Sequence, residues 1–135
     1  MKKLLLFAVF LTSGLLHAQD QGQIIRSIYF GGGSWYIDEY QVEELYHFID
    51  SLPGSMSYSI SIHSHTDNIG GVAFNQMLSE YRSKAALRVL LEKGYSRDAI
   101  EIKDFGLHNP VFDNSTYEGR LKNRRVDIIF WPQVL

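Results

Sequence analysis

The stretch SHTDNIGGVAFNQMLSEYR, residues 64–82, predicts a change from a strand to a helix. Residues 56–62, just before it, alternate between apolar and small polar side chains, which is typical of a half-buried strand. Gly70 and Gly71 mark a turn, and from Phe74 onward apolar residues recur at helical spacing. The polar turn therefore follows the end of a strand, where α/β sheets commonly hold their ligands.

Similar patterns extend over the rest of the chain and predict one α/β domain. Four segments have the composition of strands and are expected at about residues 24–30, 56–62, 100–105 and 125–131. Two segments have helical periodicity and end signals, and are expected at about residues 38–51 and 71–93. A polar loop is expected at residues 106–119. Strands that alternate with helices favour a sandwich in which helices pack on a small sheet.

The composition fits one compact globular domain, because 45% of the 135 residues are hydrophobic and 21% are charged. The net charge is −2 and the pI is about 6.2, which gives no indication of nucleic acid or of an anionic membrane surface as a partner. The chain has no cysteine, which excludes disulfides, cysteine metal sites and a lipid attached to cysteine.

The N-terminus has the layout of a secretory signal peptide. Two lysines form a short positive region, residues 4–16 are almost entirely apolar, and Ala18 offers a small residue for cleavage. The apolar run is shorter than the roughly 20 residues needed to cross a bilayer. We therefore expect residues 1–18 to be a signal peptide and residues 19–135 to be the mature, exported domain, without a transmembrane segment. An uncleaved membrane anchor is the alternative.

Five polar side chains of the central stretch are able to bind a ligand: His65, Thr66, Asp67, Asn75 and Arg82. Asn75 and Arg82 are close to two helical turns apart, roughly 10 Å along the axis, so they lie on one stripe of the helix. Because helical side chains lean toward the N-terminus, Arg82 can reach back toward Asp67. A carboxylate and a guanidinium that face one space suit a zwitterion, with an ammonium at Asp67 and a carboxylate at Arg82. The alternative is that Asp67 and Arg82 pair with each other and stiffen the loop.

Three motifs, in this order, resemble those of the OmpA-like C-terminal domain family. They are HTDNIG at residues 65–70, NxxLSxxR at residues 75–82, and the series FG…P…N…GR…NRRV at residues 105–126. The resemblance covers about residues 24–131. That family binds peptidoglycan in the periplasm of Gram-negative bacteria. The resemblance implies a small mixed sheet with helices packed on one face, an OmpA-like sandwich in the order βαβαββ.

The resemblance also implies a function and a set of ligand contacts. In the family, the domain grips the diaminopimelate of the peptidoglycan stem peptide without covalent chemistry, which implies anchoring or scaffolding in the cell envelope. The contact positions correspond to six residues of this chain: Asp67, Arg82, Asn75, Arg124, Thr66 and Leu78. No catalytic residue and no cofactor are expected, so we expect a binding domain and not an enzyme. Peptidoglycan is the expected partner, with envelope proteins as further candidates. The expected location is the periplasm, with association to the outer membrane left open.

Two positions in these motifs lead to further expectations. Arg124 and Arg125 would point to opposite faces of a strand, so only one can join the site and the other is expected to be a solvated surface charge. Ser64 stands where the family usually has glycine, and its side chain is expected to crowd the backbone slightly.

Metal-dependent hydrolysis is the second hypothesis for this chain. His63 and His65 are two residues apart in an extended segment, so both lie on one face. Together with Asp67 they could hold a metal ion. A catalytic zinc site needs at least three good protein ligands and an open position, however, and the other histidines are distant in the sequence.

Overall fold

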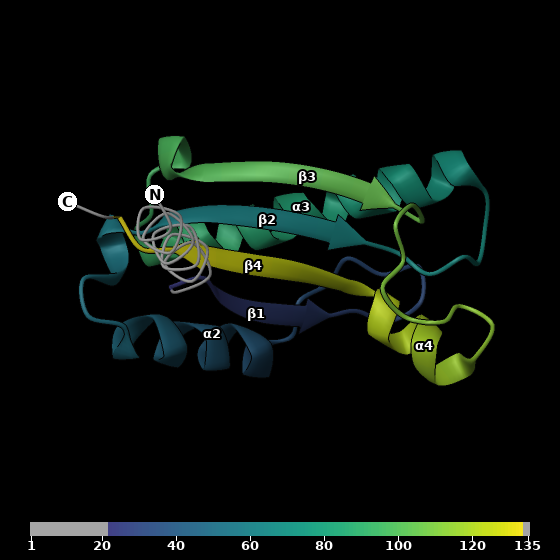
Figure 1. The fold of residues 1–135 in the computed structure, drawn as a ribbon, viewed down its shortest axis with the longest axis horizontal. Helices are drawn as coiled ribbons and strands as arrows, with labels where there is room; N and C mark the ends of the chain where they lie inside the picture. Colours follow the sequence, from purple (N-terminus) through teal and green to yellow (C-terminus); the bar gives the residue numbers. More distant parts are fainter. Residues whose placement is uncertain (1–21, 134–135) are drawn as a thin grey trace, which may run out of the picture.

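Residues 22–133, the part of the chain that the computed structural model describes, form a four-stranded mixed sheet with helices beside it (Figure 1). The strands are β1 (Ile24–Tyr29), β2 (Ser59–His65), β3 (Ile100–Gly106) and β4 (Arg125–Trp131). The helices are α2 (Glu39–Ser51), α3 (Val72–Lys93) and α4 (Tyr117–Asn123). The strand order is β1-β4-β2-β3, with β4 antiparallel to both neighbours and β2 parallel to β3. The predicted α/β fold with a small mixed sheet is confirmed.

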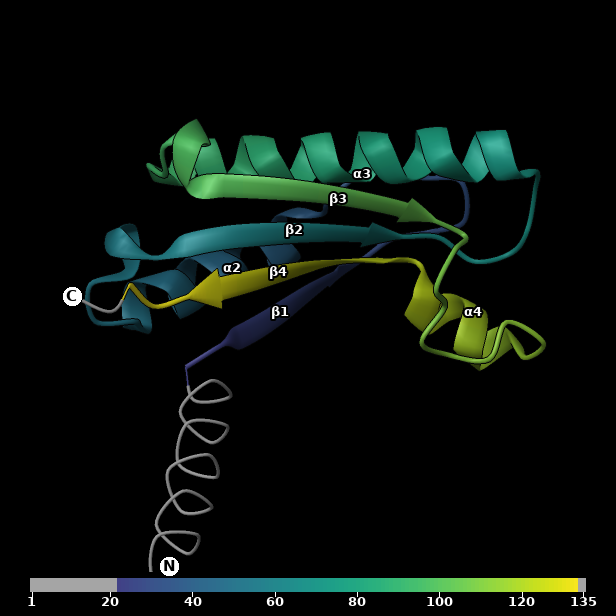
Figure 2. The same cartoon turned by 45° about the horizontal axis from the view of Figure 1, so that its top comes forward.

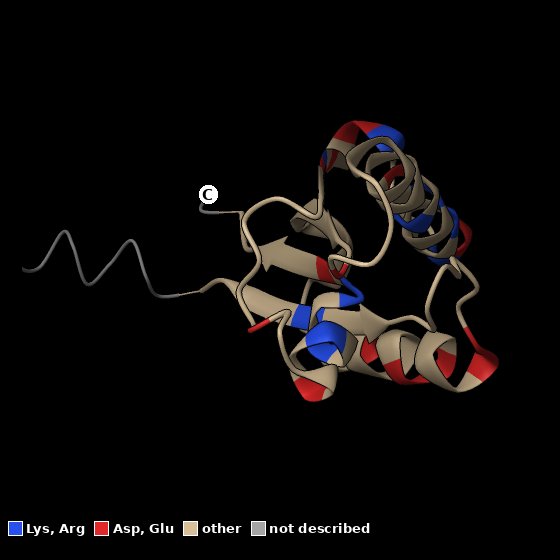
Figure 3. Cartoon of the chain, turned by 90° about the vertical axis from the view of Figure 1, so that its right-hand side faces the viewer, with Lys and Arg blue, Asp and Glu red and all other residues tan. Residues whose placement is uncertain are grey.

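The two long helices, α2 and α3, pack on the same face of the sheet. Figure 3 shows both on one side of the strands, and Figure 2 shows α3 running alongside β3. Alternate strand residues point to this face and are buried against both helices. The core includes Ile28, Ile60, Ile62, Val126, Ile128 and Phe130 from the strands and Leu45, Ile49, Ala86 and Leu90 from the helices. Each large apolar side chain buried here contributes about 1.5–3 kcal/mol to the stability of the fold, so the core holds the sheet and the two helices together.

The bounds of both long helices follow from their end signals. Asp38 caps α2, because its carboxylate accepts a hydrogen bond from the backbone N–H of Gln41 at 3.0 Å. Gly94 ends α3 with a φ of 121°, a conformation that favours glycine. Both helices begin and end within one residue of the bounds that the sequence predicts.

The second strand begins later than the sequence predicts. The alternating residues 56–58 do not belong to β2, which starts at Ser59. They follow Gly54, which has a φ of 65°, and Ser55–Ser57 form a single 3-10 turn. The alternation of small polar and apolar residues is therefore shared here by a tight turn and a strand.

The short helix α4 lies partly inside the predicted polar loop. Thr116 caps it, because its hydroxyl accepts a hydrogen bond from the backbone N–H of Gly119 at 3.0 Å. A Cβ atom at Gly119 would overlap the carbonyl oxygen of Asp113, so the helix can fold back on this loop only with glycine there. A helix this short, with glycine in its first turn, has little periodicity to predict it.

The predicted signal peptide, residues 1–18, lies outside the described residues. Between residues 22 and 133, no helix is both long enough and apolar enough to cross a membrane.

Candidate ligand-binding site

The turn between β2 and α3 lies where the sequence predicts it, and two predicted site residues hold it together. The Asp67 carboxylate accepts a hydrogen bond from the backbone N–H of Ile69 at 3.0 Å. The Asn75 amide nitrogen donates to the carbonyls of Ile69 at 3.0 Å and Gly71 at 3.2 Å. The turn is therefore fixed from both sides, and Asp67 stays at the strand exit.

Arg82 is almost completely buried, with 1% of its surface exposed. Its guanidinium donates to three backbone carbonyls, those of Ser34 at 2.8 Å, His65 at 3.0 Å and Gly31 at 3.1 Å. Burial lowers the pKa of Arg82 to about 10, and the nearby charge of Asp67 acts in the opposite direction. The side chain remains charged at neutral pH and ties the loop after β1 to the end of β2 and to α3.

Asp67 pairs with Arg124, and the alternative that it pairs with Arg82 is wrong. The Nε of Arg124 donates to Oδ2 of Asp67 at 2.6 Å, and both side chains are largely buried. Arg124 is the C-terminal cap residue of α4, so this helix brings it to the end of β2. Figure 3 looks toward this end of the sheet, where acidic and basic segments meet. Arg82 is not the partner because its donors are directed to the loop carbonyls.

Arg125 is also not the solvated surface charge that the sequence predicts. It is 5% exposed, and its Nε donates to both carboxylate oxygens of Asp127 at 3.0 and 3.1 Å. Its guanidinium lies 5.4 Å from the ring centroid of Phe112, which precedes α4. The expectation that Arg124 and Arg125 take separate places holds, but the second arginine is packed and paired.

Five of the six predicted contact residues line one cavity of about 190 Å³, which we call the strand-end cavity. Its lining consists of Asp67, Asn75, Leu78, Arg82 and Arg124 together with Gly32, Gly33, Ile69 and Phe74. Thr66 does not line it. Thr66 is 2% exposed, and its hydroxyl and backbone N–H donate to the carbonyls of Asp67 and Gly106. Its place is behind the cavity wall, where it fixes the end of β2.

The glycine loop after β1 is a part of this cavity that sequence reasoning missed. Gly32 lies against Arg124, such that a Cβ atom there would be 3.5 Å from the guanidinium carbon. Gly33 has a φ of 65°, which favours glycine. The run of three glycines at residues 31–33 indicates a flexible turn. Nothing in its spacing shows that this turn contacts Arg82 of α3, 51 residues after Gly31.

The cavity wall contains a buried acceptor without a partner. The two hydrogen bonds from the Asn75 amide nitrogen set the orientation of the side chain, and Oδ1 of Asn75 has no hydrogen-bond partner among the described residues. Such an atom costs free energy unless a ligand or water pairs with it. With the Asp67 carboxylate and two guanidinium groups nearby, the cavity can accept hydrogen bonds from an ammonium and donate them to a carboxylate.

The sequence predicts only that Ser64 crowds the backbone slightly, but the structure shows a further contact of its side chain. The side chain is fully buried, and its hydroxyl donates to the carbonyl of Ser79 on α3 at 2.7 Å. The hydroxyl thus links β2 to α3 beside the cavity.

The histidine pair does not form a metal centre in this geometry. His63 and His65 both lie beside Phe105, with ring centroids 5.4 and 5.1 Å from it. Burial lowers the pKa of His65 to about 4, so this imidazole is neutral at neutral pH. Within residues 22–133 no group of three or more histidine, aspartate or glutamate side chains is placed to hold a metal ion. The hydrolase hypothesis therefore has no support from the described residues.

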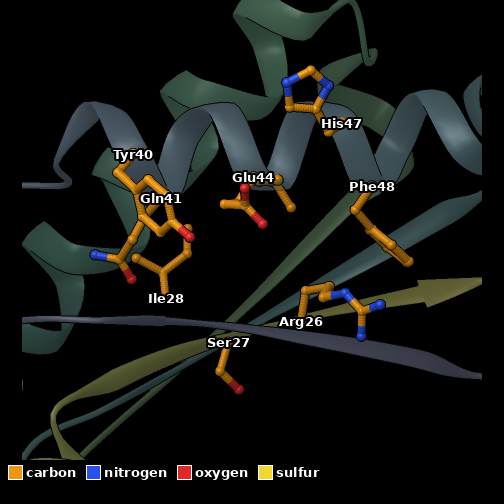
Figure 4. Close-up of a pocket in the computed structure, with 9 residues that line it drawn as sticks. Arg26, Ser27, Ile28, Tyr40, Gln41, Glu44, His47 and Phe48 are labelled. Carbon is orange, nitrogen blue, oxygen red and sulfur yellow. The ribbon is translucent and has the colours of Figure 1, made fainter.

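A second, larger cavity of about 410 Å³ lies between β1 and α2, and we call it the edge cavity (Figure 4). Figure 4 shows Tyr40, Glu44 and Phe48 projecting from α2 toward the strand, whereas Ser27 points away from the helix. The Gln41 amide bonds both backbone groups of Tyr29, accepting from its N–H at 2.8 Å and donating to its carbonyl at 3.0 Å.

A model of the OmpA family matches residues 29–124. The chain belongs to the OmpA family. The matched region contains every residue that lines the strand-end cavity, so the resemblance drawn from the motifs is confirmed for the part of the fold that forms the site.

Similar proteins of this family come from several bacteria. The chain is 43% identical over 70 residues to the outer-membrane lipoprotein YfiB of Pseudomonas aeruginosa, covering 52% of this chain and 42% of the relative. It is 38% identical over 80 residues to the peptidoglycan-binding protein ArfA of Mycobacterium bovis, covering 59% and 24%. The chain thus spans less than half the length of these relatives. The solved peptidoglycan-associated lipoprotein of Burkholderia pseudomallei has a TM-score of 0.65 and 25% identity, over 78% of this chain and 89% of that one.

Proposed function

We propose that this OmpA-family chain binds peptidoglycan without covalent chemistry, through the diaminopimelate of the stem peptide, and that it anchors or scaffolds in the cell envelope. One observation carries the proposal. The same small cavity is lined by a buried carboxylate, two guanidinium groups and an amide whose oxygen has no partner among the residues that the structure describes. The similar protein ArfA is a peptidoglycan-binding protein, and the similar protein YfiB is an outer-membrane lipoprotein, which supports the proposal.

The cavity suits the free amino-acid end of diaminopimelate. This end has an ammonium and a carboxylate on one carbon. Asp67 and Oδ1 of Asn75 would accept hydrogen bonds from the ammonium. The carboxylate would lie near Arg82 and Arg124. Among residues 22–133, Arg82 uses three of its five N–H donors on backbone carbonyls, and Arg124 uses its Nε on Asp67, so both arginines have further donors for a ligand.

The structure changes the roles we assign to the two arginines. Arg82 places its charge in the wall and holds the loop of Gly32 and Gly33, so it shapes the cavity as well as attracting an anion. Arg124 is more exposed and ends in a guanidinium fork with free nitrogens, so it is the better candidate for bidentate contact with a carboxylate.

Residues 1–18, as a signal peptide, would deliver the domain of residues 19–135 to the periplasm, where peptidoglycan lies. This location is consistent with the envelope proteins to which the chain is similar. The function we propose is binding, with no reaction step and no cofactor.

Asp67→Asn is the sharpest test of this proposal. The substituted amide keeps an oxygen that can accept from the Ile69 N–H, so the turn should remain, while the charge that pairs with Arg124 and would hold the ammonium is removed. Loss of a charge-assisted contact predicts binding roughly 10- to 100-fold weaker. The readouts are co-sedimentation with purified sacculi and calorimetric titration with meso-diaminopimelate.

Asp50→Asn is the matched control, because Asp50 also pairs with a basic side chain, Lys93, but is exposed and lies outside the cavity. The Asp50→Asn variant should bind sacculi as well as the unchanged protein does. Adding a chelator should not change the binding of the unchanged protein to sacculi. If Asp67→Asn still sediments with sacculi as well as the control does, the assignment of the cavity is wrong.

A further inference from the structure

Exposed aromatic side chains lie beside the strand-end cavity. Phe74 lines the cavity and is 45% exposed. Tyr81 lies seven residues farther along α3, on the same stripe, and is 39% exposed. Trp35 is 50% exposed and packs against Tyr81, with ring centroids 4.9 Å apart and an interplanar angle of 31°. We call Phe74, Tyr81 and Trp35 the aromatic rim.

The aromatic rim and the cavity are held by the same side chain. Arg82, which lines the cavity, donates to the carbonyl of Ser34, the residue just before Trp35. Arg82 also follows Tyr81 directly on α3. The distance between the indole and the cavity is therefore set by a buried guanidinium with three hydrogen bonds, and not by a free loop.

A concentration of exposed aromatic rings is uncommon on a protein surface and indicates an interaction site. Trp35 packs on Tyr81 and still has half of its residue surface in solvent, so we infer that part of the ring is available for a flat apolar partner. The side of a pyranose ring that presents its C–H groups is such a partner. Lys84, whose Nζ lies 5.6 Å from the Tyr81 ring centroid, adds a hydrogen-bond donor at the border of the rim.

The size of the cavity also supports a sugar as the ligand of the aromatic rim. A volume of about 190 Å³ holds an amino-acid end but not the glycan to which a stem peptide is attached. The rest of the ligand must therefore lie on the surface around the cavity. Tyr81 is roughly 10 Å beyond Phe74 along the helix, a span that about three extended residues can cover. A sugar at the far end of a short stem peptide can thus reach the aromatic rim.

Resting on the proposed function, we propose that the aromatic rim is a second subsite, in which Trp35 and Tyr81 stack against a sugar ring of the glycan strand. The cavity would select the amino-acid end, and the rim would favour stem peptides that are still joined to sugar. The domain would then distinguish intact wall from free peptide.

The test compares two ligands, a disaccharide-peptide fragment of peptidoglycan that contains diaminopimelate and the same peptide without its sugars. The unchanged protein should bind the sugar-bearing fragment more tightly. Trp35→Ala and Tyr81→Ala should each remove most of this difference, a loss of roughly two- to tenfold for one aromatic stacking contact, and should leave the affinity for the bare peptide unchanged. Tyr36→Ala is the matched control, because Tyr36 is 70% exposed in the same loop and lies outside the rim.

A spectroscopic readout makes the test independent of any change in folding. The chain has two tryptophans, so in Trp131→Phe the tryptophan fluorescence, excited selectively above the tyrosine absorption, comes from Trp35 alone. The sugar-bearing fragment should shift this emission, and the bare peptide should leave it nearly unchanged. The subsite is refuted if the unchanged protein binds both ligands equally, or if Trp35→Ala weakens both equally. It is also refuted if Trp35→Ala changes the oligomeric state, which would make the rim a contact between copies. Failure to bind either ligand would instead overturn the proposed function, and this inference with it.

Discussion

The strand-end cavity and the edge cavity differ in size and in the state of their polar groups. The strand-end cavity has about 190 Å³ and the edge cavity about 410 Å³. In the smaller one, Asp67 and Arg82 are almost completely buried, and an oxygen of Asn75 has no partner in the described part of the chain. In the larger one, Tyr40 and Glu44 are exposed, and the amide of the Gln41 side chain is fully engaged with the neighbouring backbone and Asp38.

This contrast leads us to use the burial of charge, and not cavity volume, as the guide to the candidate site. A charged or polar group costs several kcal/mol when it is taken out of water, and the cost is offset only by good partners. Within residues 22–133, Arg82 has three such partners, whereas Oδ1 of Asn75 has none. An open groove lined by exposed side chains has no comparable cost, so its presence says little about function.

Arg82→Ala should have the largest effect and would test whether the smaller cavity depends on its buried charge. The substitution leaves the carbonyls of Gly31, Ser34 and His65 without their donor, so we expect the free energy of unfolding to fall by about 3 kcal/mol or more. Binding to sacculi should be lost as well. Chemical denaturation measures the first and co-sedimentation the second.

Arg88→Ala is the control on the same helix, because Arg88 is exposed. Its unfolding free energy should stay within about 0.5 kcal/mol of the unchanged protein. Equal stability of the two variants would show that Arg82 does not hold the loop.

Protonation of His65 should have the next largest effect on stability. It tests, through the pH dependence of unfolding, how strongly burial near Arg82 disfavours charge. Its carbonyl accepts from Arg82, and burial lowers the pKa of its imidazole from 6.5 to about 4. As the pH falls below 6.5, the imidazole of His65 therefore becomes protonated in the unfolded chain, whereas in the folded chain it is protonated only near pH 4. Stability from this group is complete above pH 6.5 and is lost as the pH falls, by up to about 3 kcal/mol.

Denaturation curves between pH 7 and pH 4 measure this dependence. His65→Gln should flatten the profile over that interval, because its side chain does not titrate. An identical pH profile for the variant and the unchanged protein would contradict the burial of a neutral His65.

Arg124→Ala should have a moderate effect on the strand-end cavity. It removes the partner of Asp67 and the more exposed of the two guanidinium groups, so we expect binding about tenfold weaker, or about 1.4 kcal/mol. Lys122→Ala is a matched control, since Lys122 pairs with Glu118 on the surface of α4. Titration with meso-diaminopimelate compares them, and equal affinities would remove Arg124 from the site.

Glu44→Gln in the edge cavity should have the smallest effect. Glu44 is exposed, so its neutralisation should change the unfolding free energy by less than about 0.5 kcal/mol and leave sacculus binding unchanged. A loss of binding equal to that of Asp67→Asn would mean that the larger cavity takes part in recognition, which would reverse the comparison.

The elements of the fold were predictable where a local pattern decides them. Asp38 and Gly94 bound the two long helices in the sequence as they do in the structure, and residues 125–131 form β4 as predicted. The start of β2 and the helix α4 were missed because a 3-10 turn and a seven-residue helix that contains a glycine have weak patterns of their own.

The partners within the site were not predictable, because they come from distant segments. The Asp67 carboxylate meets a guanidinium 57 residues away, and Arg82 bonds to carbonyls 48 and 51 residues before it. Any residue has a backbone carbonyl, so no side-chain motif marks the loop that receives Arg82. The motif positions could place the cavity but could not show which of its charges face each other.

The hydrogen bonds of Gln41 to Tyr29 have a consequence for how molecules of this protein behave together. β1 is an edge strand, and unpaired backbone groups on such a strand can join another chain into a growing sheet. Gln41 occupies both backbone groups of Tyr29, and the Arg26 side chain donates to the carbonyl of Ile25 at 3.3 Å. The ladder that a second molecule would need is therefore interrupted near both ends of the strand. A side-chain amide on a surface helix thus occupies backbone groups at the β1 edge that a second molecule would need for pairing; β3 forms the other edge of the sheet.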